Sequence, residues 1–386
     1  MFSREFLLAA TSFFFAVSLF MVQPIIPVYL YKDLETSEQL VGVITALMAF
    51  SSVFLRIPCA LCARGRRVLA AMIAGLSLNA FSLLGYGLSW DPYVFAVFRV
   101  IHGVALALNY TLLLSIASMI SGQDNLEESV TGYSISLALG LWIGPASGVL
   151  LRGVIGLRQL MFAASGLASI SILSGLALSI GLRGSCSTTV SDSGDIKSFL
   201  KPANVYLGLT YLSFMFAFGA LSAYAPLKAK LDFGLSDQLI ILLFTGYYFI
   251  VFLARVFLLK ARGLRESIGS LRLLSVSLVS GVVGMVLLGL SGDVILFMLS
   301  FSLTGFAHGT VFPLTAALVA RETPHGLRVI GNSVYLTSAD LGNLLGPVFV
   351  SGLLGFTSLS FSLSAASIAP ALGLLMVRKL RGLGLR

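Results

Sequence analysis

Charge is what this sequence lacks most. Only 11% of its 386 residues are Asp, Glu, Lys or Arg, whereas 57% are hydrophobic. A soluble globular protein carries roughly 25% charged residues, so the charges here are too few to cover a water-exposed surface. The composition excludes an ordinary soluble globular protein and predicts a surface that faces lipid.

The sequence also lacks the usual marks of an enzyme or an ATP-driven machine. It has no GxxxxGK[ST] phosphate-binding loop, no cluster of metal ligands and no nucleophile–base pair. Of its three cysteines, Cys59 and Cys62 form a CxxC without a second ligand pair, and Cys186 stands alone in a polar stretch. We therefore expect no enzymatic activity, no cofactor and no bound metal.

Long polar intervals are almost absent, and long apolar runs take their place. A bilayer core needs roughly 20 helical residues to cross it, and helices satisfy their own backbone groups as lipid cannot. The runs do not alternate as barrel strands do, and the first is too long for a signal peptide and lacks a cleavage site. The sequence predicts an all-α polytopic membrane protein with twelve transmembrane helices, at residues 6–30, 39–61, 68–89, 93–120, 130–151, 159–181, 203–226, 239–259, 273–291, 294–320, 329–354 and 357–377.

One long polar interval divides the chain. Residues 183–202 are rich in Ser, Gly and Asp, a composition typical of a flexible linker. We predict an N-terminal six-helix bundle over residues 1–182, a cytoplasmic linker over 183–202 and a C-terminal six-helix bundle over 203–386.

The two predicted bundles share short motifs. LGLWIGP at 139–145 recurs as LGNLLGP at 341–347, the ARG at 63–65 recurs at 261–263, and the His-Gly pair at 102–103 recurs at 308–309. Three matches in the same order and at similar offsets indicate a duplicated unit. Because six helices return the chain to its starting side, the copies form a parallel repeat.

The net charge of +9 raises the possibility of a nucleic-acid partner, but membrane topology explains it better. Of the 25 Lys and Arg residues, 17 fall on the side of the N-terminus and five on the other. This excess follows the positive-inside rule and predicts a multi-pass protein of the plasma membrane with both termini cytoplasmic. The expected partners are the bilayer and a small-molecule substrate, with no nucleic acid, and we expect a monomer.

Three motifs resemble signatures of the major facilitator superfamily of secondary transporters, and the resemblance covers nearly the whole chain. RGRRVL at 64–69 is similar to the family's loop 2–3 signature, FRVIHG at 98–103 to its helix 4 signature, and GLWIGPASG at 140–148 to its helix 5 antiporter signature. In the family the last is found mainly in proton-exchanging exporters. One departure is Cys62, which stands where the loop signature usually has an acid, so the charge relay of that loop is in doubt.

The glycines of the helix 5 motif fall on one helical face, at i, i+4 and i+8. Small residues let helices approach closely in lipid, and Pro145 bends the helix at the end of this face. The face is either static packing within one bundle or a seam along which the bundles slide, and the resemblance favours the seam. The predicted gate or seam residues are Arg56, Arg64, Gly65, Arg66, Gly140, Gly144, Pro145, Gly148, Arg255, Gly342, Gly346 and Pro347.

Charged residues inside predicted membrane helices are costly, by at least about 2.5–3.5 kcal/mol each at mid-bilayer, and are usually paired or functional. Asp340 is the only acid among them and shares a helical face with Ser333 and Thr337. It is either a proton carrier or cation site, or the partner of Arg56 or Arg255 in an ion pair that acts as a gate. For those two arginines, which lie near helix ends, snorkelling to the membrane surface is the first interpretation.

Arg99, His102 and Asn109 share one face of the fourth predicted helix. The resemblance implies that helices 1, 4, 7 and 10 line a central cavity and that Arg99 takes part in proton coupling. His102 either titrates near neutral pH or is a hydrogen-bonded packing residue. We therefore predict Asp340, Arg99 and His102 as coupling residues, and as cavity residues Gln23, Asn109, Tyr110, Tyr206, Tyr211, His308, Asn332 and Tyr335.

Together these features predict a proton-coupled secondary transporter that exports small amphipathic or hydrophobic compounds by alternating access, with the proton gradient as its driving force. An uptake permease or facilitator for sugars or organic anions is the nearest alternative. A non-transporting membrane sensor on the same scaffold is the alternative from another class.

Overall fold

The structure is a computed structural model, and it describes residues 3–62, 67–120, 126–182, 200–260, 269–323 and 328–385. Within these ranges it is all-helical, and each of the twelve predicted runs lies in a long helical segment. The segments are α1 (Arg4–Val22), η1 (Gln23–Ile25) and α2 (Ile26–Lys32) in succession, α3 (Glu38–Cys62), α4 (Arg67–Leu88), α5 (Pro92–Ile120), α6 (Leu126–Arg152), α7 (Leu157–Leu182), α9 (Pro202–Leu231), α10 (Asp237–Lys260), α12 (Ser270–Leu290), α13 (Val294–Glu322), α14 (Arg328–Leu353), and α15 (Leu359–Ala365) with α16 (Ile368–Gly382).

Eleven of these segments, among the described residues, are long and apolar enough to cross a membrane. The remaining long helix is α14, whose sequence includes Asn332, Ser333, Thr337 and Asp340. The predicted twelve-helix membrane architecture is confirmed, and the one long segment outside the eleven carries the predicted coupling acid.

The first span is not a single α-helix. A 3-10 turn, Gln23–Ile25, separates α1 from α2; Pro24 lies within this turn and Pro27 in the first turn of α2. Each proline lacks the N–H that would bond to the carbonyl four residues earlier, so the regular ladder is interrupted there. The sequence predicted one continuous helix over 6–30 and missed this interruption.

Side-chain caps mark the start of several helices, where each follows a short turn. Several helices begin just after a Ser or Asp whose side-chain oxygen accepts a hydrogen bond from a backbone N–H three residues on, over 2.8–3.3 Å. Such caps satisfy N–H groups that have no partner within the helix. The capping residues are Ser37, Asp91, Ser236, Asp293 and Ser358.

Helix α9 runs beyond the predicted end of its apolar run at residue 226. Lys228, expected in a polar loop, is only 1% exposed; it donates to Asp232 at 2.5 Å and to the Ser360 hydroxyl at 2.9 Å. Lys230 donates to Asp237 at 3.0 Å. These oxygen partners allow two lysines to continue the helix, because a buried ammonium is tolerated when it is paired.

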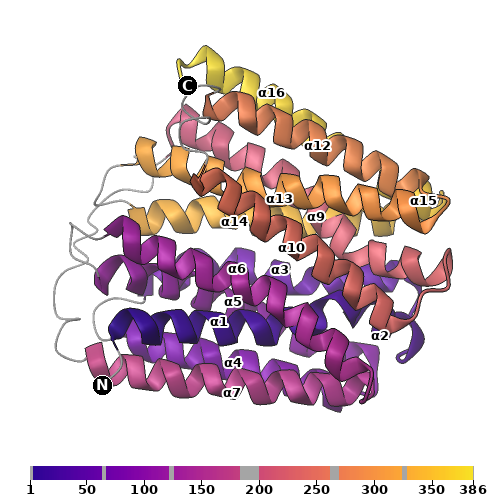
Figure 1. Cartoon of the computed structure of the whole chain (residues 1–386), viewed down its shortest axis with the longest axis horizontal. Helices are drawn as coiled ribbons and strands as arrows, with labels where there is room; N and C mark the ends of the chain where they lie inside the picture. The colour runs from indigo at the N-terminus through magenta and orange to yellow at the C-terminus, as the bar shows by residue number, and fades with distance from the viewer. Residues whose placement is uncertain are drawn as a thin grey trace. The chain divides into compact units, whose positions relative to one another are not determined.

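Clustering of the helical contacts divides the chain into two compact units. Unit 1 contains Met1–Pro24 and Phe50–Ser193, and unit 2 contains Ile25–Ala49 and Gly194–Arg386. Within unit 1, α1 packs on α6 and α7, and α4 packs on α5 and α7 (Figure 1). Within unit 2, α9 packs on α14 and α16, and α13 packs on α10 and α12. The division at a linker over 183–202 stays a prediction, and the grouping of Ile25–Ala49 with unit 2 was not foreseen.

Glycines of the repeated LGxxxGP motif bring helices of each unit into backbone contact. In unit 1, a Cβ on Gly144 would lie 2.9 Å from the Val17 carbonyl oxygen of α1, and one on Gly140 would overlap Ala16. Pro145 and Gly148 are buried on the same helix. The motif thus packs α6 on α1 inside one unit, as the packing interpretation requires, whereas the sliding seam stays a prediction.

Unit 2 repeats this arrangement with α14 and α9. A Cβ on Gly342 would lie 2.6 Å from the Leu212 carbonyl oxygen, and one on Gly346 would overlap the carbonyl oxygen of Phe216. Pro347 follows and is buried. The matched motifs at 139–145 and 341–347 therefore have the same structural role: each packs the fifth membrane helix of its half, α6 or α14, against the first, α1 or α9.

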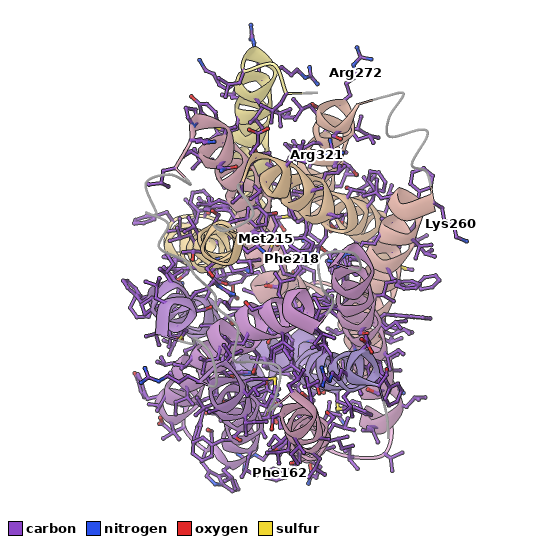
Figure 2. All side chains as sticks on the ribbon, turned by 90° about the vertical axis from the view of Figure 1, so that its left-hand side faces the viewer. Phe162, Met215, Phe218, Lys260, Arg272 and Arg321 are labelled. Atoms are coloured by element: carbon purple, nitrogen blue, oxygen red, sulfur yellow. The ribbon has the colours of Figure 1, made fainter. Side chains whose placement is uncertain are left out.

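Basic residues collect at one end of the unit 2 helices. Lys260 ends α10, Arg272 lies in the first turn of α12, and Arg321 lies in the last turn of α13. Because these helices alternate in direction, the three positions belong to the same end of the unit, the one that faces the viewer in Figure 2. Met215 and Phe218 of α9 lie farther inside the same unit.

We expect Gly346→Ala to lower the unfolding free energy by roughly 1–3 kcal/mol, the usual cost of overpacking, because the new methyl group meets the Phe216 carbonyl. Gly352→Ala is the matched control on the same helix, where nothing lies within 4 Å of the added Cβ. Thermal unfolding of the detergent-purified variants measures both. Equal melting temperatures for the two variants would contradict the proposed backbone contact.

Candidate functional site

Arg99, one of the predicted coupling residues, is fully buried on α5 in unit 1. Its Nη1 donates to Oε1 of Gln23 over 3.3 Å, and its guanidinium lies 5.9 Å from the centre of the Tyr86 ring. Gln23 opens the 3-10 turn of the first span. An amide oxygen and an aromatic face both favour a cation that has lost its water. The structure thus brings together two residues, Arg99 and Gln23, that were predicted for different roles.

His102 of α5 is the centre of a chain of buried hydrogen bonds. Its Nδ1 lies 2.8 Å from the Tyr86 hydroxyl, and its Nε2 lies 2.8 Å from Oδ1 of Asn79, both on α4. Asn79 Nδ2 in turn donates to the Ser18 hydroxyl of α1 at 3.2 Å, and Ser18 donates to the Phe15 carbonyl at 2.8 Å. Three helices of unit 1 are therefore joined through polar side chains in their interior.

The partners in this chain of hydrogen bonds determine which ring nitrogen of His102 carries the proton. Asn79 directs its N–H at Ser18, so its carbonyl oxygen faces His102 and accepts. Nε2 of His102 must then donate, which leaves Nδ1 to accept from the Tyr86 hydroxyl. With both ring nitrogens satisfied, His102 takes the hydrogen-bonded packing role, and its part in proton coupling stays a prediction.

Tyr86, Asn79 and Ser18 were not among the predicted site residues. Asn79 and Tyr86 are seven residues apart on α4 and so share a helical face. Polar side chains at this spacing within an apolar run are a usable signal, because lipid disfavours an amide on an exposed face. No residue of α4 was among the predicted site residues, although this spacing is visible in its sequence.

His308 of α13 is the repeat partner of His102 but lies in different surroundings. Its Nδ1 pairs with the Tyr247 hydroxyl of α10 at 3.0 Å. Its ring centre lies 4.4 Å from that of Phe218 and 5.7 Å from that of Phe214, both on α9. The matched His-Gly motifs thus place one imidazole in a polar chain in unit 1 and the other in an aromatic cluster in unit 2.

Two predicted cavity residues on α5 face the interior of unit 1. Asn109 is fully buried, and its Oδ1 lies 2.5 Å from where a Cβ on Gly75 of α4 would be. Tyr110 makes an edge-to-face contact with the Phe15 ring, with centres 5.4 Å apart, and its carbonyl accepts from the Tyr133 hydroxyl at 3.4 Å. Their contact with a substrate stays a prediction.

Predicted cavity tyrosines of unit 2 stack on one another. The rings of Tyr211 and Tyr335 are 4.9 Å apart and nearly parallel, and the Tyr335 hydroxyl pairs with that of Thr315 at 2.5 Å. Tyr206 packs against the same apolar cluster, and Asn332, on α14, is half-buried. These side chains join α9, α13 and α14, and as cavity residues they stay predictions.

Asp340 lies on α14 and is 9% exposed. The Thr337 hydroxyl donates to the Ser333 carbonyl at 2.8 Å, as expected for residues one turn apart on a helix. Ser333 is buried as well. The carboxyl group therefore belongs to a polar face of a membrane helix and is largely shielded from solvent.

The structure corrects the interpretation of Arg56. This residue is only 3% exposed, donating from Nη1 to the Thr111 hydroxyl at 3.3 Å and from Nη2 to the Ser52 hydroxyl at 3.1 Å. Snorkelling was therefore the wrong expectation, because hydroxyl groups inside unit 1 take the place of surface water. Arg255 is half-buried, with its guanidinium 5.4 Å from the centre of the Phe312 ring.

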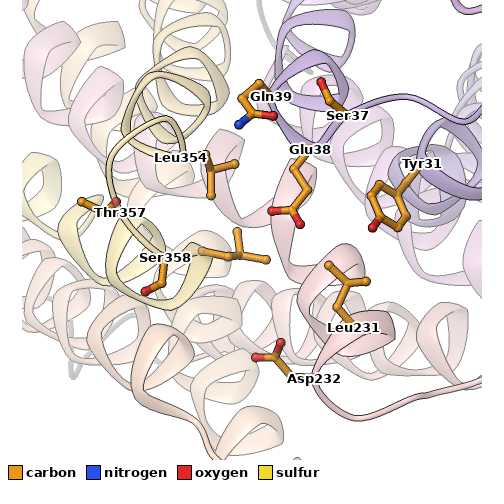
Figure 3. A pocket seen from close by; sticks show the side chains of 10 residues that line it. Tyr31, Ser37, Glu38, Gln39, Leu231, Asp232, Leu354, Thr357 and Ser358 are labelled. Carbon is orange, nitrogen blue, oxygen red and sulfur yellow. The ribbon is translucent and has the colours of Figure 1, made fainter.

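Unit 2 contains a pocket of about 550 Å³ at the ends of its helices (Figure 3). Two carboxylates, Glu38 and Asp232, contribute to its wall. The other lining residues are Tyr31, Ser37, Gln39, Leu231, Leu354, Thr357, Ser358 and Leu359. None of them was a predicted site residue, since the predicted residues lie within membrane helices or in the loop that follows α3.

Two predictions concern the loop signature and metal binding. Arg64, Gly65 and Arg66 of the loop signature lie outside the described residues. In the described ranges no group of three or more His, Cys, Asp or Glu side chains is placed to hold a metal ion.

Comparison with known protein families matches residues 8–261 and 207–383 to the Major Facilitator Superfamily. No curated protein matches the sequence. The fold is similar to a bacterial homologue of the human lysosomal transporter Spinster in an inward-facing, occupied conformation, with a TM-score of 0.75, 14% identity and coverage of 98% of this chain and 96% of the other.

Two further solved structures have the same fold. The nucleoside transporter NupG gives a TM-score of 0.75 at 13% identity, and the alignment covers 98% of this chain and 100% of the NupG chain. The human organic anion transporter MFSD10 (TETRAN) gives 0.68 at 14% identity, covering 97% and 98%. At these identities the similarity establishes the fold alone.

We expect Tyr86→Phe to lower the unfolding free energy by about 1–3 kcal/mol, because His102 Nδ1 loses its donor while it remains buried. Tyr93→Phe is the matched control, since Tyr93 lies on α5 and is 70% exposed; it should be nearly neutral. Thermal unfolding in detergent provides the comparison. A Tyr86→Phe protein as stable as the control would show that the hydrogen-bond chain contributes nothing.

Proposed function

Because the chain belongs to the Major Facilitator Superfamily, we propose that it is a proton-coupled secondary transporter that exports small amphipathic or hydrophobic compounds by alternating access. That it is a multi-pass membrane transporter follows from the family and the fold. Coupling, direction and substrate class are the proposed part.

The observation that carries the proposal is Asp340. It is the one acidic residue within the central part of a described membrane helix, and it is 9% exposed. A charged carboxyl group in such a place is energetically costly, so it is usually paired with another group or serves a function. In the proposed mechanism it takes up a proton on one side of the membrane and releases it on the other, as the accessible side of the protein changes. An ion-pair gate is the competing role.

Arg99 and Gln23 supply the second element of the proposed mechanism. They meet at the 3-10 turn of the first span, where prolines interrupt the helical ladder. Interrupted helices in transporters expose backbone groups that bind substrates or ions. In our proposal this corner of unit 1 faces the substrate, with Arg99 as its fixed positive charge.

The aromatic interior of unit 2 supports the proposed substrate class. Phe214, Phe218 and Tyr247 surround His308, and such rings suit apolar or amphipathic molecules. The buried Arg99 favours an anion instead, and therefore an uptake permease or facilitator for organic anions is the second candidate.

The proposed orientation places both termini in the cytoplasm and the protein in the plasma membrane as a monomer. It is supported by the gathering of Lys260, Arg272 and Arg321 at one end of the unit 2 helices, because cytoplasmic helix ends are rich in Lys and Arg.

A ligand screen comes first, by thermal stabilisation of the purified protein, since a ligand that binds the folded state raises its apparent stability. With a ligand in hand, proteoliposomes with an imposed proton gradient test coupling. We expect Asp340→Asn to lose proton-driven accumulation while it retains exchange of labelled for unlabelled substrate, because exchange needs no net proton movement.

Asp340→Glu is the control, since it keeps the carboxyl group and should keep some proton-driven transport. Unchanged proton-driven transport in a folded Asp340→Asn protein would rule out the proton-carrier role. Loss of exchange as well as accumulation, together with a lower melting temperature, would favour the ion-pair gate instead.

The same assay separates the other candidates. An exporter exchanges substrate for protons, whereas an uptake symporter moves the two in the same direction. A non-transporting sensor is stabilised by its ligand but gives no flux in either direction.

A further inference from the structure

The hairpin Ile25–Ala49 belongs to unit 2, although the rest of its two membrane helices belongs to unit 1. It contains α2, the short turn over residues 33–37 and the first half of α3. The chain passes from unit 1 to unit 2 within the 3-10 turn, between Pro24 and Ile25. It returns to unit 1 within α3, between Ala49 and Phe50.

Two side-chain hydroxyls hold the start of α3. Tyr224 of α9, fully buried, donates to the Glu38 carbonyl oxygen at 3.1 Å. Ser351 of α14, 8% exposed, donates to the Gln39 carbonyl oxygen at 3.0 Å. Both donors are neutral and both acceptors are backbone carbonyls, so these two bonds can break and re-form without separating charges.

Gly42 makes the approach possible. A Cβ at this position would overlap the Tyr224 hydroxyl and would lie 3.0 Å from the Pro347 carbonyl oxygen. To make room, the whole Tyr224 ring would have to swing away, and the backbone of Pro347 would have to shift as well. Glycine is a poor helix former, and its place in the first turns of α3 is explained by this close contact.

The contact also adjoins the pocket at the ends of the unit 2 helices. Glu38 and Gln39, whose carbonyls accept the two hydroxyls, line the pocket together with Leu354, which comes three residues after Ser351 (Figure 3). Release of the hairpin would widen this pocket towards the interior of the unit. The pocket is therefore placed where an entrance would form.

We propose that the Gly42–Tyr224–Ser351 contact is a reversible latch that closes one end of the transporter, and that Gly42 is the residue that allows it to close. The inference rests on the proposed alternating access, because a latch has a function only if this end of the protein opens and closes. In the latched state the hairpin lies on α9 and α14, and in the released state it leaves them.

The test measures latch opening without a substrate. Cys59, Cys62 and Cys186 are replaced by Ser, and Ala46→Cys is introduced as a reporter, because Ala46 is 2% exposed, lies one turn after Gly42 and makes neither of the latch hydrogen bonds. Its rate of reaction with a maleimide is measured on purified protein. We expect Gly42→Val to raise the labelling rate several-fold, because the larger side chain prevents closure and exposes position 46. Gly246→Val, on α10 of the same unit, is the matched control, since nothing lies within 4 Å of a Cβ there.

A second variant guards against misfolding. Tyr224→Phe keeps the ring and removes only the hydroxyl that bonds to Glu38, and it should raise the labelling rate by a smaller factor. Size-exclusion profiles establish which variants are folded. Unchanged labelling in folded Gly42→Val, or in Tyr224→Phe if the valine variant does not fold, overturns the latch.

Different results would reject the latch and the proposed function. Faster labelling in the variants with no flux of any ligand through the native protein would retain the latch as a conformational contact and reject proton-coupled export. Normal flux through the native protein with unchanged labelling in the variants would retain transport and reject the latch.

Discussion

Lipid offers no hydrogen bonds, and each polar group that this chain carries into the membrane must find its partner within the protein. Two buried arginines show how neutral groups contribute to meeting this requirement. Arg56 uses two hydroxyls, and Arg99 uses an amide oxygen and lies near an aromatic ring. Lys228 is an exception among the described residues, because it pairs with a carboxylate, and it lies in the last turn of its helix.

The same constraint explains how the helices pack. Without a hydrophobic force to drive helices together in lipid, close backbone contact must supply the attraction, and glycine permits the closest contact. Gly144 against α1 and Gly346 against α9 show this in the two units. The proline after each glycine then costs little, since the helix is held by its neighbour and not by its own ladder alone.

The twelve helices could be predicted because apolar runs of membrane length, interrupted by polar turns, have few alternative structures. The 3-10 turn at Gln23–Ile25 was missed because it lies within one apolar run, where hydropathy does not register a lost backbone donor. The grouping of Ile25–Ala49 with unit 2 depends on contacts with residues some two hundred positions away, such as Tyr224. No local pattern encodes such contacts.

The candidate site was predictable only in part, for a similar reason. Arg99 and Gln23 stood out by their chemistry, but their meeting at 3.3 Å depends on how α5 lies against the first span. His102 and His308 share a motif and differ in surroundings, because the first is bonded to two side chains of α4 and the second meets α9 and α10. Their equal sequence context does not give them equal surroundings, because helix packing places different neighbours beside each ring.

The polar chain from Tyr86 through His102 and Asn79 to Ser18 has a direction, since each group donates to the next and the last ends on a carbonyl. Such an array is an aligned set of dipoles inside a medium of low dielectric constant, where neighbouring bonds polarise one another. Because the terminal carbonyl can only accept, reversing any other bond would set donor against donor or leave that carbonyl without its partner. Unit 1 thus contains an internal electric dipole of fixed orientation, built from neutral side chains.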